Sequence, residues 1–238
     1  MGCYEINIRN AYYTKIREIG QKDDLYQSFL VRSSETNNEY AYKYIDISAL
    51  NKNTKKDLLY IIEYLKKINH PNMIELKYAY YSENQKLNVF IEYSDKGTLK
   101  MKLDEQKTKG QYFDENTLIN WFYQICLALK YIHSIKFLHK NINPSNIFLM
   151  NDNFAKLGIV GLENGFIPNI IQSKRKVNPY LAPEIRHDEY FTYKSDIWVL
   201  GTTFYQLIIL DYPFEGESFE EMPRNIESGI KKPNSKRL

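Results

Sequence analysis

The sequence predicts an α+β fold in two lobes, a small β-rich N-terminal lobe with one helix and a larger, mostly α-helical C-terminal lobe. Strand patterns come first, one amphipathic helix interrupts them, and helical patterns follow a short linker. The 238 residues, 43% of them hydrophobic, suffice for two lobes with real cores. We expect an N-terminal extension over 1–11, the first lobe over 12–93, a linker over 94–97 and the second lobe over 98–238.

The region 12–45 is predicted to form strands. Apolar and polar residues alternate over Lys15–Ile19 and again over Glu39–Tyr44, as expected for strands with one buried face. Between these segments, Asn37-Asn38 is a hairpin-type turn signal.

A single helix is predicted over residues 54–69, and His70-Pro71 ends it because proline disfavours helical backbone in the residue before it. Two further strands are expected near 73–80 and 86–93. The apolar stripe of the helix consists of Leu58, Ile61, Ile62, Leu65 and Ile68.

The second lobe is predicted to be helical. Asp114 can cap a long amphipathic helix that runs to about residue 134. The apolar stretch Ile197–Leu210 is shorter than the ~20 residues of a membrane span and indicates a buried helix. A further helix is expected around 217–228. The apolar face of the long helix includes Leu118, Phe122, Ile125, Leu129 and Ile132.

Charge and cysteine content exclude some classes of protein. The net charge of +3, from 32 basic and 29 acidic residues, is too balanced for a nucleic-acid-binding protein. Cys3 and Cys126 alone give neither a disulfide framework nor a zinc site, so a reducing cytoplasm is the expected location. The chain opens with charged and polar residues rather than an apolar leader segment.

The start Met1-Gly2-Cys3 resembles an acylation signal, but that motif calls for Ser or Thr at position six, where Ile6 stands. An ordinary disordered start is the favoured interpretation. Association with a membrane is expected only if Gly2 and Cys3 are acylated.

The most informative segment is Phe137–Phe148, which reads F-L-H-K-N-I-N-P-S-N-I-F. It resembles the catalytic loop of a protein kinase, H-R-D-L-K-P-x-N, with His139, Pro144 and Asn146 retained. Asn141 stands at the position of the catalytic aspartate and Asn143 at that of the lysine two residues later.

Other motifs support the resemblance to the protein kinase domain from about Tyr13 to the end of the chain. Ala182-Pro183-Glu184 matches A-P-E, and Ser195–Gly201 matches the start of a central helix whose Asp196 would brace the catalytic loop. His139, Asp196 and Glu184 are therefore expected to have structural roles. The subfamily that Trp121–Lys130 and Asn146–Leu149 resemble is the NIMA-related (NEK) Ser/Thr kinases.

The resemblance implies a vestigial ATP pocket. Lys43 matches the strand lysine that holds the nucleotide phosphates. The other pocket positions that the resemblance implies are Gly20, Ala41, Ile91 as gatekeeper, Glu92 and Phe148.

Several groups that phosphoryl transfer requires are absent. Asn141 is neutral and cannot act as the base. Ile159, 18 residues later, replaces the metal-binding aspartate of D-F-G, which leaves Asn146 as the one expected metal ligand. Ile61 occupies the position of the helix glutamate that pairs with Lys43, and Glu63 would point about 200° away.

The phosphate-binding loop is also degraded. A kinase reads G-x-G-x-x-G, whereas only Gly20 remains here, and Asp23-Asp24 brings negative charge near the phosphate position. Val177 replaces the threonine of a G-T-P motif. Without carboxylate partners, the Lys43 ammonium is expected to recruit Asp23 or Asp24, with Asp57 as the alternative.

We therefore expect a NEK-like pseudokinase that acts as a scaffold or allosteric regulator of a protein partner, an active kinase being one candidate. The expectation includes no cofactor: ATP bound weakly or not at all, and independently of Mg²⁺. The alternatives are a weakly active ATP-dependent Ser/Thr kinase and a truncated, non-functional product. The last kinase helices, with the arginine that would pair with Glu184, are expected to be missing. Either Arg186 or Lys194 then pairs with Glu184 instead, or the second lobe is only marginally stable.

Overall fold

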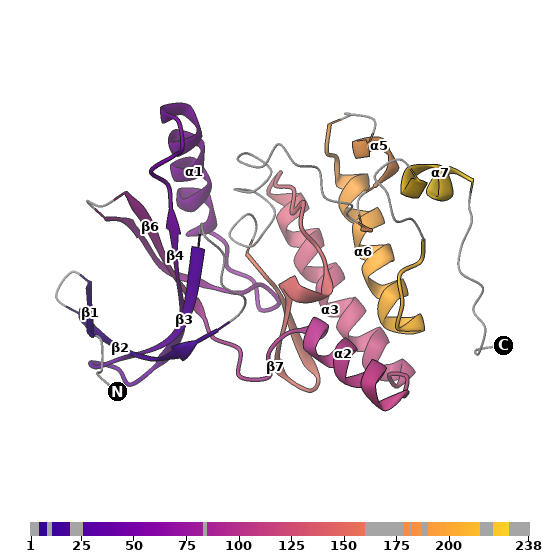
Figure 1. Cartoon of the computed structure of the whole chain (residues 1–238), viewed down its shortest axis with the longest axis horizontal. Helices are drawn as coiled ribbons and strands as arrows, with labels where there is room; N and C mark the ends of the chain where they lie inside the picture. The colour runs from indigo at the N-terminus through magenta and orange to yellow at the C-terminus, as the bar shows by residue number, and fades with distance from the viewer. Residues whose placement is uncertain are drawn as a thin grey trace. The chain divides into compact units, whose positions relative to one another are not determined.

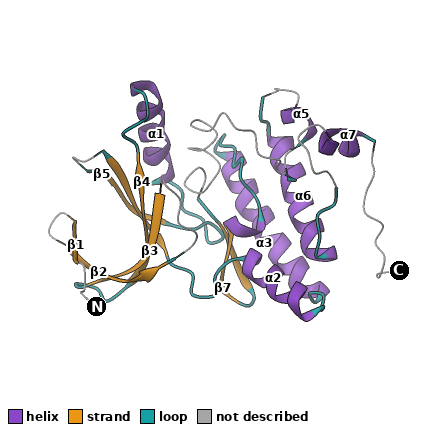
Figure 2. Ribbon diagram, viewed as in Figure 1, coloured by secondary structure: helices purple, strands orange, loops and turns teal. Residues whose placement is uncertain are grey.

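A computed structural model of the chain describes residues 5–8, 11–19, 26–82, 85–159, 179–180, 182–186, 190–214 and 221–228 (Figure 1). Contacts divide the chain into two compact units. The first contains the residues up to Asn69 together with Ile74–Tyr93, and the second contains His70–Met73 and the residues from Ser94 onward. The first unit is built around a sheet and the second is mostly helical (Figure 2), as predicted for an α+β fold.

A six-stranded antiparallel sheet forms the first unit, in the order β1-β2-β3-β4-β6-β5. Asn37, with a φ of 58°, lies in the turn between β3 and β4, where the sequence predicts a hairpin. The strands are β1 (Glu5–Ile8), β2 (Ala11–Glu18), β3 (Tyr26–Ser33), β4 (Glu39–Asp46), β5 (Leu76–Tyr81) and β6 (Lys86–Glu92).

Residues Glu5–Ile8, within the expected N-terminal extension, form a strand paired with β2. Met1, Gly2 and Cys3, the expected disordered start, lie outside the described residues. One sequence prediction about the sheet is wrong. The strand expected from residue 73 begins at Leu76, because His70–Met73 belong to the second unit, where Met73 bridges to Leu157.

Aromatic side chains pack together against one face of the sheet. The rings of Tyr42 and Phe90 lie 4.6 Å apart, and the rings of Tyr13 and Phe90 lie 4.8 Å apart. The Tyr42 hydroxyl donates to Asn88 Oδ1 at 2.8 Å, and burial raises the pKa of Tyr42. The buried members of this cluster are Tyr13, Phe29, Val31, Tyr42 and Phe90, with Tyr40, Tyr44 and Tyr80 packed against them.

The helix α1 (Lys52–Leu65) buries Leu58, Ile62 and Leu65, three residues of the predicted stripe. It ends four residues before the predicted end at residue 69. Lys67 N donates to Tyr64 O, an i to i−3 bond that tightens the chain into a turn. Ile68 consequently lies outside the helix and is half-buried.

The second unit contains the helices α2 (Leu99–Lys109), α3 (Glu115–Ser134), α5 (Pro183–Arg186), α6 (Tyr193–Ile209) and α7 (Glu221–Glu227), with the 3₁₀ turn η1 (Pro144–Asn146) and the hairpin of β7 (Ile147–Asn151) and β8 (Phe154–Leu157). Asp114 caps α3 as predicted, since its side chain accepts from Thr117 N. Residues 217–220, the start of the last predicted helix, lie outside the described residues.

Burial in α3 and α6 departs from the sequence prediction. Phe122, expected in the apolar face of α3, is 41% exposed, and its neighbour Trp121 is buried instead. Ile197 and Ile208, expected inside a buried helix, are also exposed.

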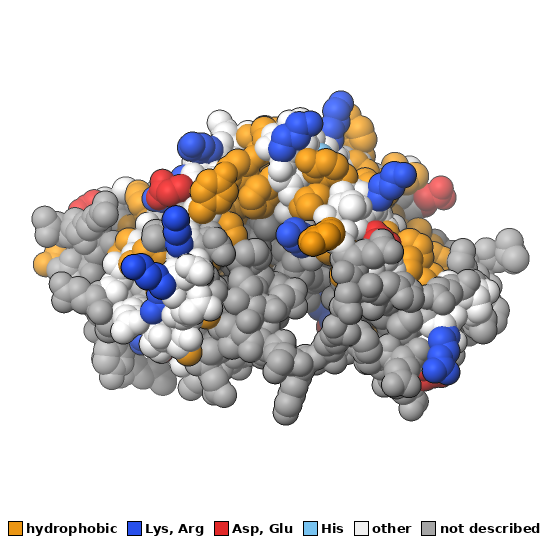
Figure 3. Space-filling view, turned by 90° about the horizontal axis from the view of Figure 1, so that it is seen from above, with side chains coloured by type: hydrophobic (Ala, Val, Ile, Leu, Met, Phe, Trp, Pro, Cys, Tyr) orange, Lys and Arg blue, Asp and Glu red, His pale blue; other side chains and the backbone are white. Residues whose placement is uncertain are grey.

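Charges are mixed over the surface. Figure 3 shows Lys and Arg side chains placed singly among hydrophobic and acidic ones on one face of the molecule. Among the described residues, no helix is long and apolar enough to cross a membrane, and no three His, Cys, Asp or Glu side chains are grouped as metal ligands.

Candidate active site

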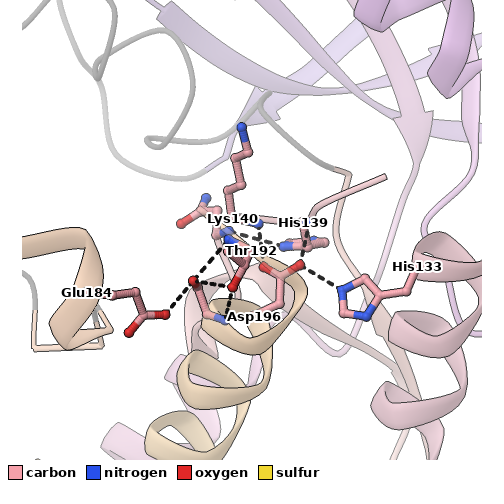
Figure 4. Close-up of polar contacts among 8 residues, drawn as sticks. His133, His139, Lys140, Glu184, Thr192 and Asp196 are labelled. Carbon is pink, nitrogen blue, oxygen red and sulfur yellow. Dashed lines mark hydrogen bonds and ion pairs between the residues drawn. The ribbon is translucent and has the colours of Figure 1, made fainter. Parts of the chain in front are cut away.

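A buried carboxylate holds the candidate catalytic loop in place. Asp196 is fully buried in the first turn of α6. Its Oδ2 accepts from His139 N and its Oδ1 from Lys140 N, each at 2.8 Å. His133 Nε2, from the last turn of α3, lies 2.9 Å from Oδ2 (Figure 4). Bonds to an ionised acceptor are about twice as strong as neutral ones, so Asp196 is the main brace of this loop.

The loop backbone is strained where Asp196 holds it. Lys140 has a φ of +64°, a left-handed backbone conformation that residues other than glycine adopt rarely. This conformation destabilises the folded state by about 1 kcal/mol or more. The bond from Lys140 N to Asp196 offsets this strain.

The His139 ring connects the loop to the segment that precedes Ile159. Nε2 lies 3.1 Å from Gly158 O, and Nδ1 accepts from Asn141 N at 3.3 Å. The ring is completely buried, and this burial lowers the pKa of His139. A neutral ring with its proton on Nε2 satisfies both contacts.

Three asparagines are hydrogen-bonded to one another around η1. Asn143 Nδ2 donates to Asn141 Oδ1 at 2.9 Å, and Asn146 Nδ2 donates to Asn141 O at 3.0 Å. Asn143 Oδ1 accepts from Ser145 N at 2.9 Å and so caps η1. The side chain at the catalytic-base position is therefore both neutral and engaged by its neighbour.

Asn146 presents an amide oxygen with no partner among the described residues. The side chain is 1% exposed, and its buried Oδ1 accepts no hydrogen bond from the residues that the structure describes. Its backbone O accepts from Gly158 N at 2.8 Å, and a Cβ on Gly158 would collide with Oδ1. An unsatisfied hard oxygen fits Mg²⁺, whereas the buried hydrocarbon of Ile159 does not.

The first unit holds the predicted phosphate lysine. Lys43, in β4, is 8% exposed and lies opposite Val89 of β6, and Ala41 lies opposite Ile91. Glu92 N donates to Glu75 O at 3.0 Å.

The other positions that the sequence analysis relates to Lys43 are only partly described. Ile61 lies half-buried in α1. Gly20, Asp23 and Asp24 lie outside the described residues, as does the side chain of Asp57. The predicted contact between Lys43 and these carboxylates therefore stays a prediction.

Phe148 lies in β7 of the second unit, opposite Lys156 of β8. Thr98, which caps α2, forms an isolated bridge with Phe148. Ser94 Oγ donates to Leu149 O, so the residues just after Tyr93 are fixed to β7.

Glu184 accepts a hydrogen bond from a hydroxyl at the start of α6. Ser195 Oγ donates to Glu184 Oε1 at 2.6 Å, and the same serine forms a capping box with Thr192 at the start of α6 (Figure 4). Glu184 is partly exposed, so water lowers the energetic cost of its charge. The Arg186 side chain and Val177 lie outside the described residues.

Within the second unit, the structure brings together His139, Asn141, Asn143, Asn146 and Asp196. The sequence reasoning missed His133 and Gly158. The signal for His133 was a histidine in the last turn of a helix, where a carboxylate partner could have been sought. Gly158 could have been found as a glycine at the end of a strand, where backbones approach closely.

Comparison with known proteins supports the resemblance. A family model described as "Protein kinase domain" matches residues 13–236. Serine/threonine-protein kinase Nek1 of Mus musculus is 32% identical over 225 residues, which cover 94% of this chain and 18% of that protein. Nek3 of Mus musculus and Nek5 of Homo sapiens are each 32% identical, over 91% and 88% of this chain and 42% and 30% of their own lengths. The chain thus spans less than half of each of these relatives.

One sequence expectation is overturned by this comparison. The expected absence of a cofactor, with ATP weak or missing and Mg²⁺ irrelevant, is wrong as a prediction from the sequence. The relatives are serine/threonine protein kinases, and such enzymes use ATP and Mg²⁺.

Proposed function

The chain belongs to the protein kinase domain family, and within it we propose that the chain is a NEK-like pseudokinase, a scaffold or allosteric regulator that transfers no phosphate. Its partner would be a protein, an active kinase being one candidate, in the cytoplasm and without nucleic acid. Among the described residues, Lys43 would hold nucleotide phosphates and Asn146 a metal ion. The observation that carries the proposal is the pairing of Asn141 with Asn143 at the position of the catalytic base.

Phosphoryl transfer needs a group that orients the hydroxyl nucleophile and accepts its proton. A neutral amide is not a proton acceptor at ordinary pH. Asn141 Oδ1 already accepts a hydrogen bond from Asn143 Nδ2 within the loop. This oxygen therefore stabilises the loop rather than facing a substrate hydroxyl. Loss of a general base alone typically lowers a rate by about 10²–10⁴.

The second supporting observation is Ile159. Its side chain is buried and carries no oxygen, so the charge that a metal-bound carboxylate would supply is absent from this position. The bracing by Asp196 is intact meanwhile. A preserved scaffold with altered reacting groups favours a role in binding over a collapsed, non-functional product.

The test is a phosphotransfer assay of the purified chain with ATP, Mg²⁺ or Mn²⁺ and a general protein substrate. The control is Lys43→Ala, which removes the lysine that would hold the nucleotide phosphates. We expect incorporation no greater than in this control. Incorporation well above the control would overturn the proposal and favour a weak kinase.

One observation supports that second candidate. The Asn146 Oδ1 atom is buried and has no described partner, the state expected of a metal ligand. If the chain is a weak kinase, Asn146→Ala should abolish its activity and Asn141→Ala should not. If it is a pseudokinase, neither variant differs from the wild type.

A further inference from the structure

The helices α3 and α6 run antiparallel in the second unit (Figure 1). Two contacts define their register. His133 near the end of α3 bonds to Asp196 near the start of α6, and the rings of Phe122 and Phe204 meet edge to face at 5.0 Å. Ile119 therefore lies level with Ile208.

Apolar side chains are exposed on both helices beside this contact. On α3, Ile119 and Tyr123 are 57% and 61% exposed, and on α6, Ile197 is 55% exposed. They recur at helical spacing, so each set forms a stripe on one side of its helix. We call this surface the α3–α6 face, made of the exposed residues Ile119, Phe122, Tyr123, Ile197 and Ile208, with the buried ring of Phe204 packed beneath Phe122. Exposed apolar surface gathered in one region marks interaction sites.

A glycine lies in the middle of the same face. Gly201 is exposed in the interior of α6, where glycine is about 1 kcal/mol less stable than alanine. A Cβ built there meets nothing within 4 Å, so no described neighbour requires a glycine. Half-exposed Cys126 lies level with it on α3. A small residue between large apolar ones permits close approach of another backbone.

Opposite charges stand at the two ends of the face. Glu115, one turn before Ile119, and Asp211, just after α6, form an acidic pole. Lys130, one turn after Cys126, and Lys194, one turn before Ile197, form a basic pole. Glu115, Lys130 and Lys194 are exposed, and Asp211 is partly exposed.

We propose that the α3–α6 face binds a second copy of this chain in a two-fold symmetric dimer. A two-fold axis through the middle of the face brings the acidic pole of each copy against the basic pole of the other, because an isologous interface pairs a surface with itself in reverse. Paired poles form a polar rim around an apolar centre, the usual anatomy of an interface. A stable interface covers about 800 Å² per partner.

The charge arrangement favours this occupant over others. An unrelated helix would have to carry the complementary acidic and basic ends by coincidence, whereas a second copy carries them by symmetry. The dimer does not depend on phosphoryl transfer, so it stands or falls separately from the pseudokinase proposal.

The test is sedimentation velocity of the full chain at increasing concentration and low salt. We expect a dimer that Tyr123→Glu and Ile197→Glu each weaken at least about tenfold, as for residues at the centre of an interface. The matched control is Tyr190→Glu, which changes another exposed tyrosine outside the face. Circular dichroism should show that all three variants are folded.

Charge reversal tests the orientation. Lys130→Glu with Lys194→Glu should weaken the dimer, and adding Glu115→Lys with Asp211→Lys should restore it, because the poles are then exchanged and again complementary. A wild-type chain that stays monomeric at about 100 μM would overturn the proposal and leave the face to another protein or segment. A dimer insensitive to both glutamate variants would overturn it as well.

Discussion

Replacing Asp196 with alanine is expected to destabilise the second unit by about 3–5 kcal/mol. The carboxylate is fully buried and accepts from His139 N and Lys140 N at 2.8 Å, with His133 Nε2 at 2.9 Å. Alanine leaves the buried His139 N without its acceptor and removes the part-buried contacts to Lys140 N and His133 Nε2. Each unsatisfied buried group costs about 1–3 kcal/mol, and removing a buried carboxylate from its partners costs about 3–5 kcal/mol in all.

For a chain of this size, each kcal/mol lowers the melting temperature by about 2–4 °C, so Asp196→Ala should melt about 6–20 °C below the wild type. Thermal unfolding followed by circular dichroism measures this difference. The control is Asp104→Ala, which removes an exposed carboxylate paired with Lys100 and should change stability by less than about 0.5 kcal/mol. Equal melting temperatures for Asp196→Ala and Asp104→Ala would refute the bracing role.

Three further predictions follow from the site. Gly158→Ala should lower the melting temperature by several degrees, because its Cβ collides with Asn146 Oδ1; an unchanged melt contradicts that close approach. Thr192→Ala should cost about 1 kcal/mol of unfolding free energy, because it removes the side chain that accepts from Ser195 N, and urea titration measures this. His139 has a pKa lowered by burial, so the unfolded state binds its proton first as the pH falls. The contribution of the neutral His139 ring to the free energy of unfolding is therefore complete above about pH 6.5. Below that pH it is lost, by up to ~1.4 kcal/mol per pH unit. Urea titrations between pH 5 and 8 should show this slope, and His139→Gln should flatten it.

Local chemistry made much of the fold predictable. Asp114, as an N-cap residue, predicted the start of α3, and the spacing of Leu58, Ile62 and Leu65 predicted the buried face of α1. The residues of the braced loop were also found, because Asp196 and His139 belong to motifs whose spacing survives in the chain.

Other features depended on tertiary contacts that a local pattern does not contain. Ile68 continues the apolar spacing of α1, but an i to i−3 bond had already ended the helix. Phe122 fits the apolar period of α3, yet it meets Phe204 only edge to face and stays partly exposed. The buried Oδ1 of Asn146, which has no hydrogen-bond partner among the described residues, could not be predicted because it depends on the close packing of Gly158 against it.

The most direct measurement of the central claim is the turnover of ATP γ-phosphate by the wild-type chain with Mg²⁺ and a protein substrate. Active protein kinases turn over at about 1–100 s⁻¹, and loss of the base alone predicts a rate at least about 10² lower. We predict that the wild-type rate equals the rates of Lys43→Ala and Asn146→Ala, all three at the background of the assay. A wild-type rate near 1 s⁻¹ that both substitutions abolish would contradict it.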